Sequence, residues 1–220
     1  MSQRVINIIV SSFWKILLPG LIYTIPLTIV SFALGLCIAI VTALLQVMNV
    51  KVLKQISQFY VWVFRGTPLM VQLFIIFYGL PSVGLMINAI PAAIIAFSLN
   101  VGAYASETIR GSINSIPRTQ SEACFACGMT KVQAMTHVIL PQALKISIPA
   151  LFNSFISLIK DTSLAANITV TEMFMVTQRL VALTYEPLFL YIEVAFIYLI
   201  FCTGLTYLQK FLEKKLKVSA

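Results

Sequence analysis

Two long stretches without charged residues constrain the fold of this chain more than any other feature. Residues 16–50 and 66–106 contain no Asp, Glu, Lys or Arg. About 20 apolar residues cross the hydrocarbon core of a bilayer as a helix. The first stretch therefore predicts one membrane span, at about 20–46, and the second is long enough for two spans.

The second stretch is interrupted in its middle by residues that favour turns, namely Gly79, Pro81, Gly84, Asn88 and Pro91. We therefore expect its two spans at about 58–79 and 88–107. Two further apolar stretches predict spans at about 146–168 and 187–209. The segment 1–19 ahead of the first span carries spaced apolar residues and is expected to be a short interfacial helix.

Composition supports a membrane protein. Hydrophobic residues make up 60% of the chain and charged residues only 10%, whereas a soluble domain carries about 25% charged residues. Backbone groups in lipid must bond internally, and the stretches lack the alternation of a β-barrel. The sequence predicts a single all-α integral membrane domain over 1–220 with five transmembrane helices.

The net charge of +8 follows the predicted topology and does not indicate nucleic-acid binding. Five spans place the two termini on opposite sides of the membrane. With the C-terminus in the cytoplasm, the cytoplasmic segments hold ten Lys and Arg residues, and the outer segments hold only Arg4, Lys15 and Arg179. This distribution fits the positive-inside rule. We therefore expect the N-terminus outside and the loop at about 118–141 in the cytoplasm.

That loop contains a C-x-x-C pair, Cys124 and Cys127, and the single histidine, His137. A structural zinc site needs about four ligands, and the loop offers few others. A disulfide is uncommon in the cytoplasm, and a thioredoxin-type site is expected in a βαβ unit. We favour the interpretation that both cysteines are small helix residues that pack where alanine would also fit.

The loop has a helix–turn–helix pattern. Gly128 is expected to end a short helix, and a second helix at about 131–140 is expected to end at Pro141. The order Glu122-Ala123-Cys124, Gly128, Leu140-Pro141 resembles the EAA loop of ABC-importer permeases. Cys124 stands where that pattern has its second alanine, and Val138 stands where it has isoleucine.

The resemblance extends over most of residues 60–172. The segments "FRGTPLMVQLFIIFYGLP", "LNVGAYASETIRGSI" and "NSFISLIKDTSLAANI" are similar to permeases of the polar amino-acid uptake family. The third segment and the ending "YGLP" of the first most resemble the branch that takes up cystine. The resemblance implies the fold of a type I ABC importer permease in a bacterial cell membrane.

The resemblance also implies partners. Two permease subunits, expected to be two copies of one chain, form the pore within membrane lipid. A cytosolic ABC ATPase dimer with ATP and Mg binds the EAA loops, and an extracytoplasmic binding protein delivers the amino acid. The residues of this chain that match the ATPase-contacting loop are Glu122, Ala123, Cys124, Gly128, Leu140 and Pro141. No cofactor, metal or catalytic residue is expected on this chain, which lacks the phosphate-binding pattern G-x-x-x-x-G-K-[ST].

Charged residues within the predicted spans are the candidate substrate contacts, because they are costly in lipid and usually functional. At 100° per residue, Asn153, Ser157 and Lys160 fall on one helix face, and Asp161 lies about 100° from Lys160. We expect these four residues and Arg65 to line the substrate path. The alternative is structural: Lys160 and Arg65 reach the membrane surface, and Asp161 caps a helix or pairs locally. Glu107 and Arg110 are expected to form a local pair.

The sequence thus predicts the permease subunit of an ATP-driven importer, for L-cystine or another polar amino acid. It is not expected to be an enzyme. One alternative is a membrane thiol/disulfide redox protein that uses Cys124 and Cys127. Another is a secondary transporter driven by ions through Lys160 and Asp161, although no internal repeat of the kind common in such transporters is detected.

Overall fold

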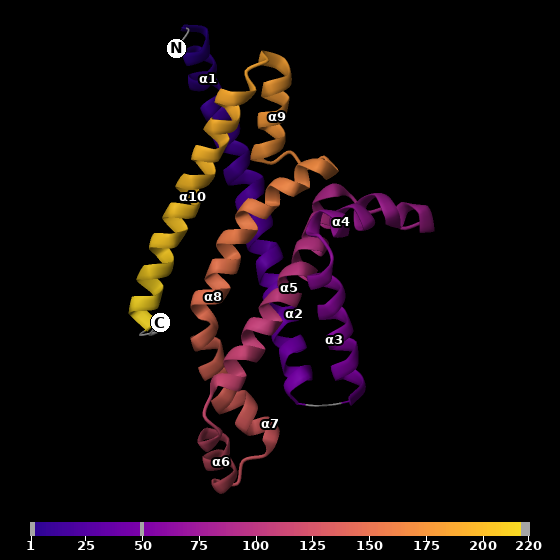
Figure 1. Cartoon of the computed structure of the whole chain (residues 1–220), viewed down its shortest axis with the longest axis vertical. Helices are drawn as coiled ribbons and strands as arrows, with labels where there is room; N and C mark the ends of the chain where they lie inside the picture. Colours follow the sequence, from indigo (N-terminus) through magenta and orange to yellow (C-terminus); the bar gives the residue numbers. More distant parts are fainter. Residues whose placement is uncertain (1–2, 49–50, 217–220) are drawn as a thin grey trace.

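The computed structural model describes residues 3–48 and 51–216, and all regular structure in these ranges is helical (Figure 1). This confirms the predicted all-α class. Within these ranges four helices are long and apolar enough to cross a membrane, and a bent pair would make a fifth span. The expected spans at about 20–46, 88–107, 146–168 and 187–209 all fall within the four long helices.

The first 45 described positions form one continuous helix, Gln3–Val47. It consists of α1 (Gln3–Pro19), the π-helical turn η1 (Gly20–Thr24) and α2 (Ile25–Val47). The π-turn lies between two prolines, Pro19 and Pro26, whose missing N–H groups break the regular pattern. At about 1.5 Å per residue this helix is much longer than a bilayer core of about 30 Å.

The structure therefore differs from the expected separate interfacial helix at 1–19, of which residues 1–2 lie outside the described ranges. Residues 3–19 extend α2 and pack against α9 (Met173–Thr184) and α10 (Pro187–Leu216). Ile16 is fully buried there with Met173, Leu190, Val194 and Ile197. Apolar packing against these two helices continues the helix beyond the predicted span.

The centre of the molecule is formed by α2, α5 (Ala89–Ser115) and α8 (Leu140–Asp161) (Figure 1). Small residues let α2 and α5 approach closely, as is usual for helices in membranes. Gly35 faces Val101, and Gly102 faces Ile38, at distances that leave no room for a Cβ atom on either glycine. Buried alanines continue the same contact along α2 and α5.

The expected span at about 58–79 is broken in the structure. Helix α3 (Lys51–Gly66) ends before Pro68, and α4 (Leu69–Phe74), η2 (Ile75–Gly79) and the 3-10 turn η3 (Leu80–Val83) run off at 106° to it. Pro68 has no N–H for the helix, and the residue before a proline disfavours the helical conformation. Thr67 therefore stands at a sharp bend, with α4 pointing away from α3 (Figure 1).

A helical loop occupies the end of the molecule opposite the N-terminus (Figure 1). It contains α6 (Arg118–Ala126), α7 (Lys131–Ala134) and the π-turn η4 (Met135–Ile139), which leads directly into α8. Pro141 does not end the second helix as expected. It lies just after the π-turn η4, inside one continuous helix from Lys131 to Ile168. The π-turn accommodates the missing N–H of Pro141, and the helix continues through the 3-10 turn η5 (Thr162–Ile168).

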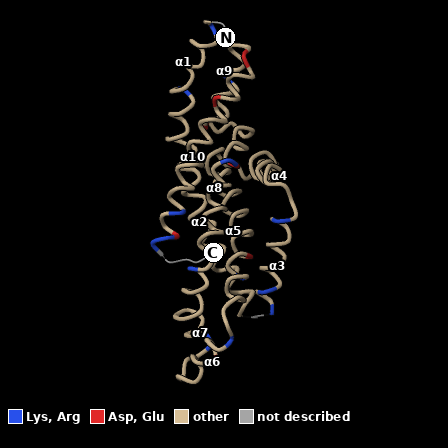
Figure 2. Tube along the Cα trace, turned by 60° about the vertical axis from the view of Figure 1, so that its left-hand side comes forward, with Lys and Arg blue, Asp and Glu red and all other residues tan. Residues whose placement is uncertain are grey.

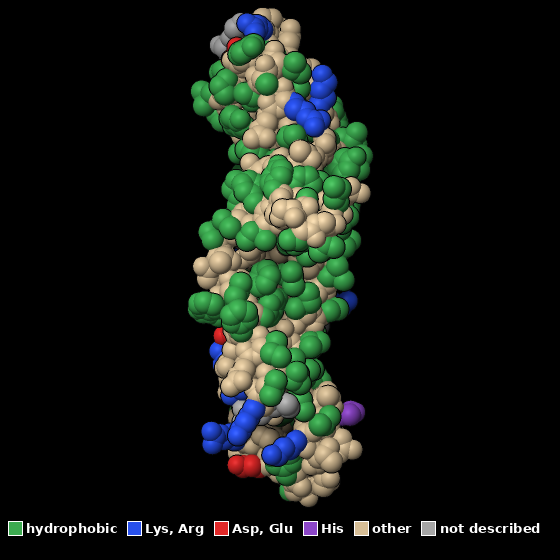
Figure 3. Space-filling view, turned by 90° about the vertical axis from the view of Figure 1, so that its right-hand side faces the viewer, with side chains coloured by type: hydrophobic (Ala, Val, Ile, Leu, Met, Phe, Trp, Pro, Cys, Tyr) green, Lys and Arg blue, Asp and Glu red, His purple; other side chains and the backbone are tan. Residues whose placement is uncertain are grey.

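The surface has the polarity of a membrane protein. Large apolar side chains such as Val10, Trp14, Ile75 and Phe196 are exposed. Figure 3 shows apolar side chains over most of one face, with Lys and Arg mainly toward its two ends. Figure 2 shows basic positions along α3 and around the α6–α7 loop.

Candidate functional site

The break between α3 and α4 borders a cavity that is open to the surface and faces α5 and α8, and we call it the central cavity. Its volume is about 390 Å³, within the usual range for small-molecule sites. The break, α5, α8 and the start of η5 all contribute lining residues: Thr67, Pro68, Leu69, Asn100, Val101, Tyr104, Ser154, Ser157, Leu158, Asp161 and Leu164.

A hydrogen-bond network holds the bend that forms one wall of this cavity. The Gln72 side-chain amide nitrogen lies 2.9 Å from the Phe64 carbonyl oxygen and 2.9 Å from Thr67 Oγ1. The Asn100 amide donates to Gln72 Oε1 at 3.0 Å. Gln72 is buried, so its amide replaces the backbone donors that the broken helix lacks. The network joins α3, α4 and α5 at the cavity wall.

The structure separates the charged residues that the sequence placed together on α8. Ser157 and Asp161 line the central cavity with Ser154. Lys160 instead lines an apolar groove between α8 and α10, with Tyr198 and Cys202 among its walls. Asn153 is exposed and lines neither space. The expected stripe of Asn153, Ser157 and Lys160 therefore does not form a single site.

The helix geometry explains this difference. Asp161 lies about 40° from Ser157 in one rotational sense, and Lys160 lies about 60° from it in the other. Either residue can therefore share a helix face with Ser157. The packing of α8 against α5 decides which of the two faces the central cavity. The cavity face contains Ser154, Ser157 and Asp161, three polar positions at helical spacing. The spacing of positions 154, 157 and 161 is visible in the sequence, and it would have indicated Ser154 as a lining residue in place of Asn153.

Arg65 lies next to the central cavity, but it lines a different space. Its guanidinium carbon is 5.3 Å from the centre of the Tyr104 ring, in the range of a cation–π contact. One of its nitrogens is 3.6 Å from Glu107 Oε2. Glu107 also accepts two hydrogen bonds from Arg110, at 3.0 and 2.6 Å. The predicted local pair of Glu107 and Arg110 is confirmed, and Arg65 joins it from α3.

The α6–α7 loop has the turn that its sequence predicts. Gly128 adopts a positive φ of 79°, and its N–H donates to the Phe125 carbonyl at 2.9 Å. Thr130 caps α7 through a reciprocal pair of bonds with Gln133. These bonds define the turn between α6 and α7.

The residues of the expected ATPase-contacting motif divide into a buried and an exposed set. Cys124 is the buried residue of α6 and is 6% exposed, whereas Cys127 follows α6 and does not pack as expected. Glu122, Ala123, Gly128 and Pro141 are exposed, and Leu140 is partly buried. Cys124 and the exposed Cys127 are both free thiols. Within the described ranges no three His, Cys, Asp or Glu side chains come together as a metal site.

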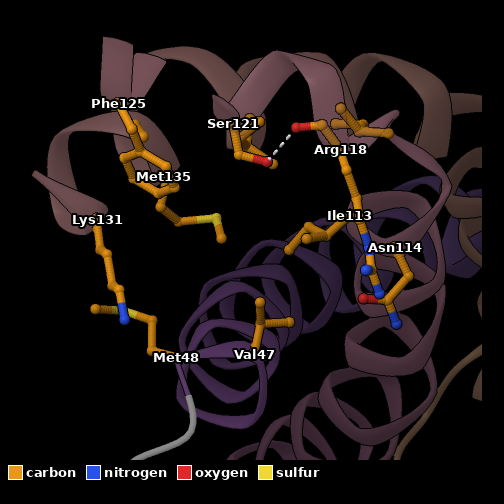
Figure 4. Close-up of a pocket in the computed structure, with 12 residues that line it drawn as sticks. Val47, Met48, Ile113, Asn114, Arg118, Ser121, Phe125, Lys131 and Met135 are labelled. Carbon is orange, nitrogen blue, oxygen red and sulfur yellow. Dashed lines mark hydrogen bonds between the residues drawn. The ribbon is translucent and has the colours of Figure 1, made fainter. Parts of the chain in front are cut away.

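The loop rests on the ends of α2 and α5 with a cavity of about 580 Å³ between them (Figure 4). Val47 and Ile113 form part of its floor, and Met135 points into it from the loop (Figure 4). Arg118 lies on one side of the cavity beside Asn114, and Lys131 lies on the other. The Ser121 hydroxyl donates to the Arg118 carbonyl at 3.0 Å, which holds the first turn of α6.

The family model and the similar proteins that this chain matches all describe membrane components of transport systems. The model of a family described as "binding-protein-dependent transport system inner membrane component" matches residues 35–218. The L-cystine transport system permease protein TcyB of Bacillus subtilis (strain 168) is 51% identical over 211 residues, which cover 96% of this chain and 90% of that protein. A probable amino-acid ABC transporter permease protein, PatM of Vibrio harveyi, is 41% identical over 83% of each chain.

A solved structure described as an amino acid ABC transporter with histidines has a similar fold. The TM-score is 0.88 at 32% sequence identity, and the superposition covers 98% of this chain and 100% of the other. The superposition therefore spans nearly the whole of both chains.

Proposed function

Because the chain belongs to the family of binding-protein-dependent transport system inner membrane components, we propose that it is the permease subunit of an ATP-driven L-cystine importer. It is a multi-pass protein of a bacterial membrane and resembles the permeases of amino-acid ABC transporters over nearly its whole length. The choice of cystine is supported by the 51% identity to a permease named for L-cystine transport.

The observation that carries the proposed substrate path is the position of Asp161. It lines the central cavity from a helix, Lys131–Ile168, that is long and apolar enough to cross a membrane, and it forms no salt bridge within the described ranges. A carboxylate in such a place needs a partner. The ammonium group of an amino acid supplies one, and the hydroxyls of Thr67, Ser154 and Ser157 supply hydrogen bonds.

Lys160 has a different role in this proposal from the one expected from the sequence. It lines an apolar groove against α10, about 100° around α8 from Asp161. It is therefore not the partner of the substrate carboxylate. Its side chain is exposed on the single chain, so it can interact with lipid or with the second permease copy.

We propose that the α6–α7 loop docks on a cytosolic ATPase that binds ATP and Mg. The loop projects from one end of the molecule (Figure 1), and its internal bonds let it transmit a displacement to α5 and α8 without bending. This end is then cytoplasmic, and so is the C-terminus. The N-terminus lies at the outer end, where a binding protein delivers substrate to a pair of permease copies.

The test is ATP hydrolysis by the complex purified from native membranes with a tag on this chain. We expect an ABC ATPase and a binding protein among the co-purified chains, and we expect the cystine-loaded binding protein to stimulate hydrolysis. Asp161→Asn should abolish the stimulation with little loss of assembled complex. Lys160→Met, which removes the neighbouring charge, is the matched control and should keep most of it. Equal stimulation in both variants would refute the role of Asp161.

A further inference from the structure

A second cavity is lined by residues of α2, α3 and α5 that lie nearer the α6–α7 end than those of the central cavity, and we call it the lower cavity. Its volume is about 540 Å³. It is lined by the last turns of α2, by α3 and by the end of α5: Gln46, Val47, Lys54, Gln58, Val61, Trp62, Arg65, Glu107, Arg110 and Asn114. Most of these side chains are polar, which is costly in a membrane bundle unless water or a ligand fills the space.

Tyr104 and Arg65 stand where the two cavities meet. Tyr104 lines the central cavity and Arg65 lines the lower one. The guanidinium carbon lies 5.3 Å from the ring centre, and the Tyr104 hydroxyl lies 3.5 Å from the Arg65 carbonyl oxygen. These two side chains therefore lie between the central cavity and the lower cavity.

Arg65 lies farther from the Glu107 carboxylate than Arg110 does. Glu107 receives its short hydrogen bonds from Arg110, at 2.6 and 3.0 Å. The Arg65 nitrogen is 3.6 Å from the same carboxylate, beyond hydrogen-bond distance. The lower cavity thus has three basic side chains and one acidic side chain in its wall, and the acidic one is bound mainly to Arg110.

Gln46 provides an independent indication of the ligand chemistry. Its side chain lines the lower cavity and is 8% exposed. Its amide nitrogen has no hydrogen-bond partner among the described residues. A buried donor without an acceptor is costly. The nitrogen itself is buried, so the Gln46 side chain must rotate before it can donate to a ligand in the cavity. Gln46 and Arg65 both offer N–H groups, and a carboxylate accepts from both.

We propose that the lower cavity is an exit subsite that binds the α-carboxylate of the amino acid after it leaves the central cavity. Arg65 is the main carboxylate-binding residue, and Gln46 donates a second bond. This inference rests on the proposed transport function. Glu107 competes with the substrate for Arg65, so the Arg65–Glu107 pair closes again when the amino acid leaves toward the α6–α7 end.

The test measures how an amino acid protects a thiol in the lower cavity from a maleimide. The complex of permease and ATPase is placed in nanodiscs, in a background where Cys37, Cys124, Cys127 and Cys202 are alanine and transport has been verified. Gln58→Cys then places a thiol in the wall of the lower cavity. The probe ligand is djenkolic acid, a thioether relative of cystine, because a disulfide would exchange with the thiol.

Djenkolic acid and its N-acetyl derivative, which keeps the carboxylates, should slow labelling at position 58, and the methyl ester should not. Arg65→Gln should raise the half-protecting concentration about tenfold or more, since a hydrogen bond to a charged group is lost. Arg179→Gln, a matched change of an exposed arginine on α9, should leave it unchanged. Arg65→Lys should restore part of the protection.

Three results would overturn the proposal: no protection at position 58, equal protection by the methyl ester, or protection that Arg65→Gln leaves intact. ATPase stimulation by the loaded binding protein is measured in the same preparation. Stimulation without protection counts against the exit subsite alone. A preparation that shows neither counts against the transport function as well.

Discussion

Loss of the Gln72 amide should destabilise the bend between α3 and α4 more than any exposed substitution in the same region. Position 68 is a proline, so the Phe64 carbonyl receives no hydrogen bond from the backbone nitrogen four residues later. The Gln72 amide nitrogen takes that place at 2.9 Å. In Gln72→Leu the carbonyl keeps only the Asn100 amide, 3.5 Å away.

The magnitude follows from two losses. A buried acceptor left without an adequate donor costs about 1–3 kcal/mol, and the lost Gln72–Asn100 bond adds about 0.6 kcal/mol at the average value for side-chain bonds in membranes. We expect the free energy of unfolding to fall by about 1.6–3.6 kcal/mol in total.

The assay is SDS-induced unfolding of the purified permease in mixed micelles. The control is Gln55→Leu, the same substitution at an exposed position of α3, which should change the unfolding free energy by less than about 0.5 kcal/mol. Equal free energies of unfolding for Gln72→Leu and Gln55→Leu would refute the reasoning, because the amide would then not be needed to hold the bend.

Three further predictions concern the α6–α7 loop and the contact between α2 and α5. Gly128→Trp should abolish substrate-stimulated ATPase activity while the chain still inserts, because the turn requires a φ of 79°; normal stimulation would count against the loop as the ATPase contact. The double variant Cys124→Ala, Cys127→Ala should transport at near wild-type rates, and a loss that tracks with reducing agent or chelator would support a thiol site instead. Gly102→Leu should lower the unfolding free energy by about 1–3 kcal/mol through overpacking, since a Cβ there would lie 2.7 Å from Ile38 Cγ2; unchanged SDS unfolding would contradict it.

The sequence predicted the parts of the fold that depend on hydrophobic length. The long apolar stretches gave the all-helical class and four of the five spans, because the length needed to cross a bilayer is fixed. Helix continuity was harder to predict. Pro19, Pro141 and Pro149 all lie within or at the start of helices, where turns and neighbours accommodate them, whereas Pro68 breaks its helix. Which proline breaks a helix depends on side chains such as Gln72 that satisfy the freed backbone groups.

The sequence predicted that polar residues of α8 would line the candidate site, but it placed them on a helix face rotated by part of a turn from the observed one. Composition and spacing indicated polar residues on α8, and Ser157 and Asp161 do line the central cavity. Lys160 lies outside it because the rotation of α8 is set by packing against α5, which sequence alone does not specify. Asn100 and Tyr104 were missed, because they follow no charged pattern and meet α8 only in the folded chain.

The central claim is tested most directly by uptake of radiolabelled L-cystine into proteoliposomes that contain this chain with its co-purified ATPase. The account predicts accumulation only when ATP is available to the ATPase and the binding protein is present on the opposite side. Asp161→Asn in this assay should reduce accumulation to the level without ATP. Accumulation driven by an ion gradient in the absence of ATP would contradict the account and support an ion-coupled transporter.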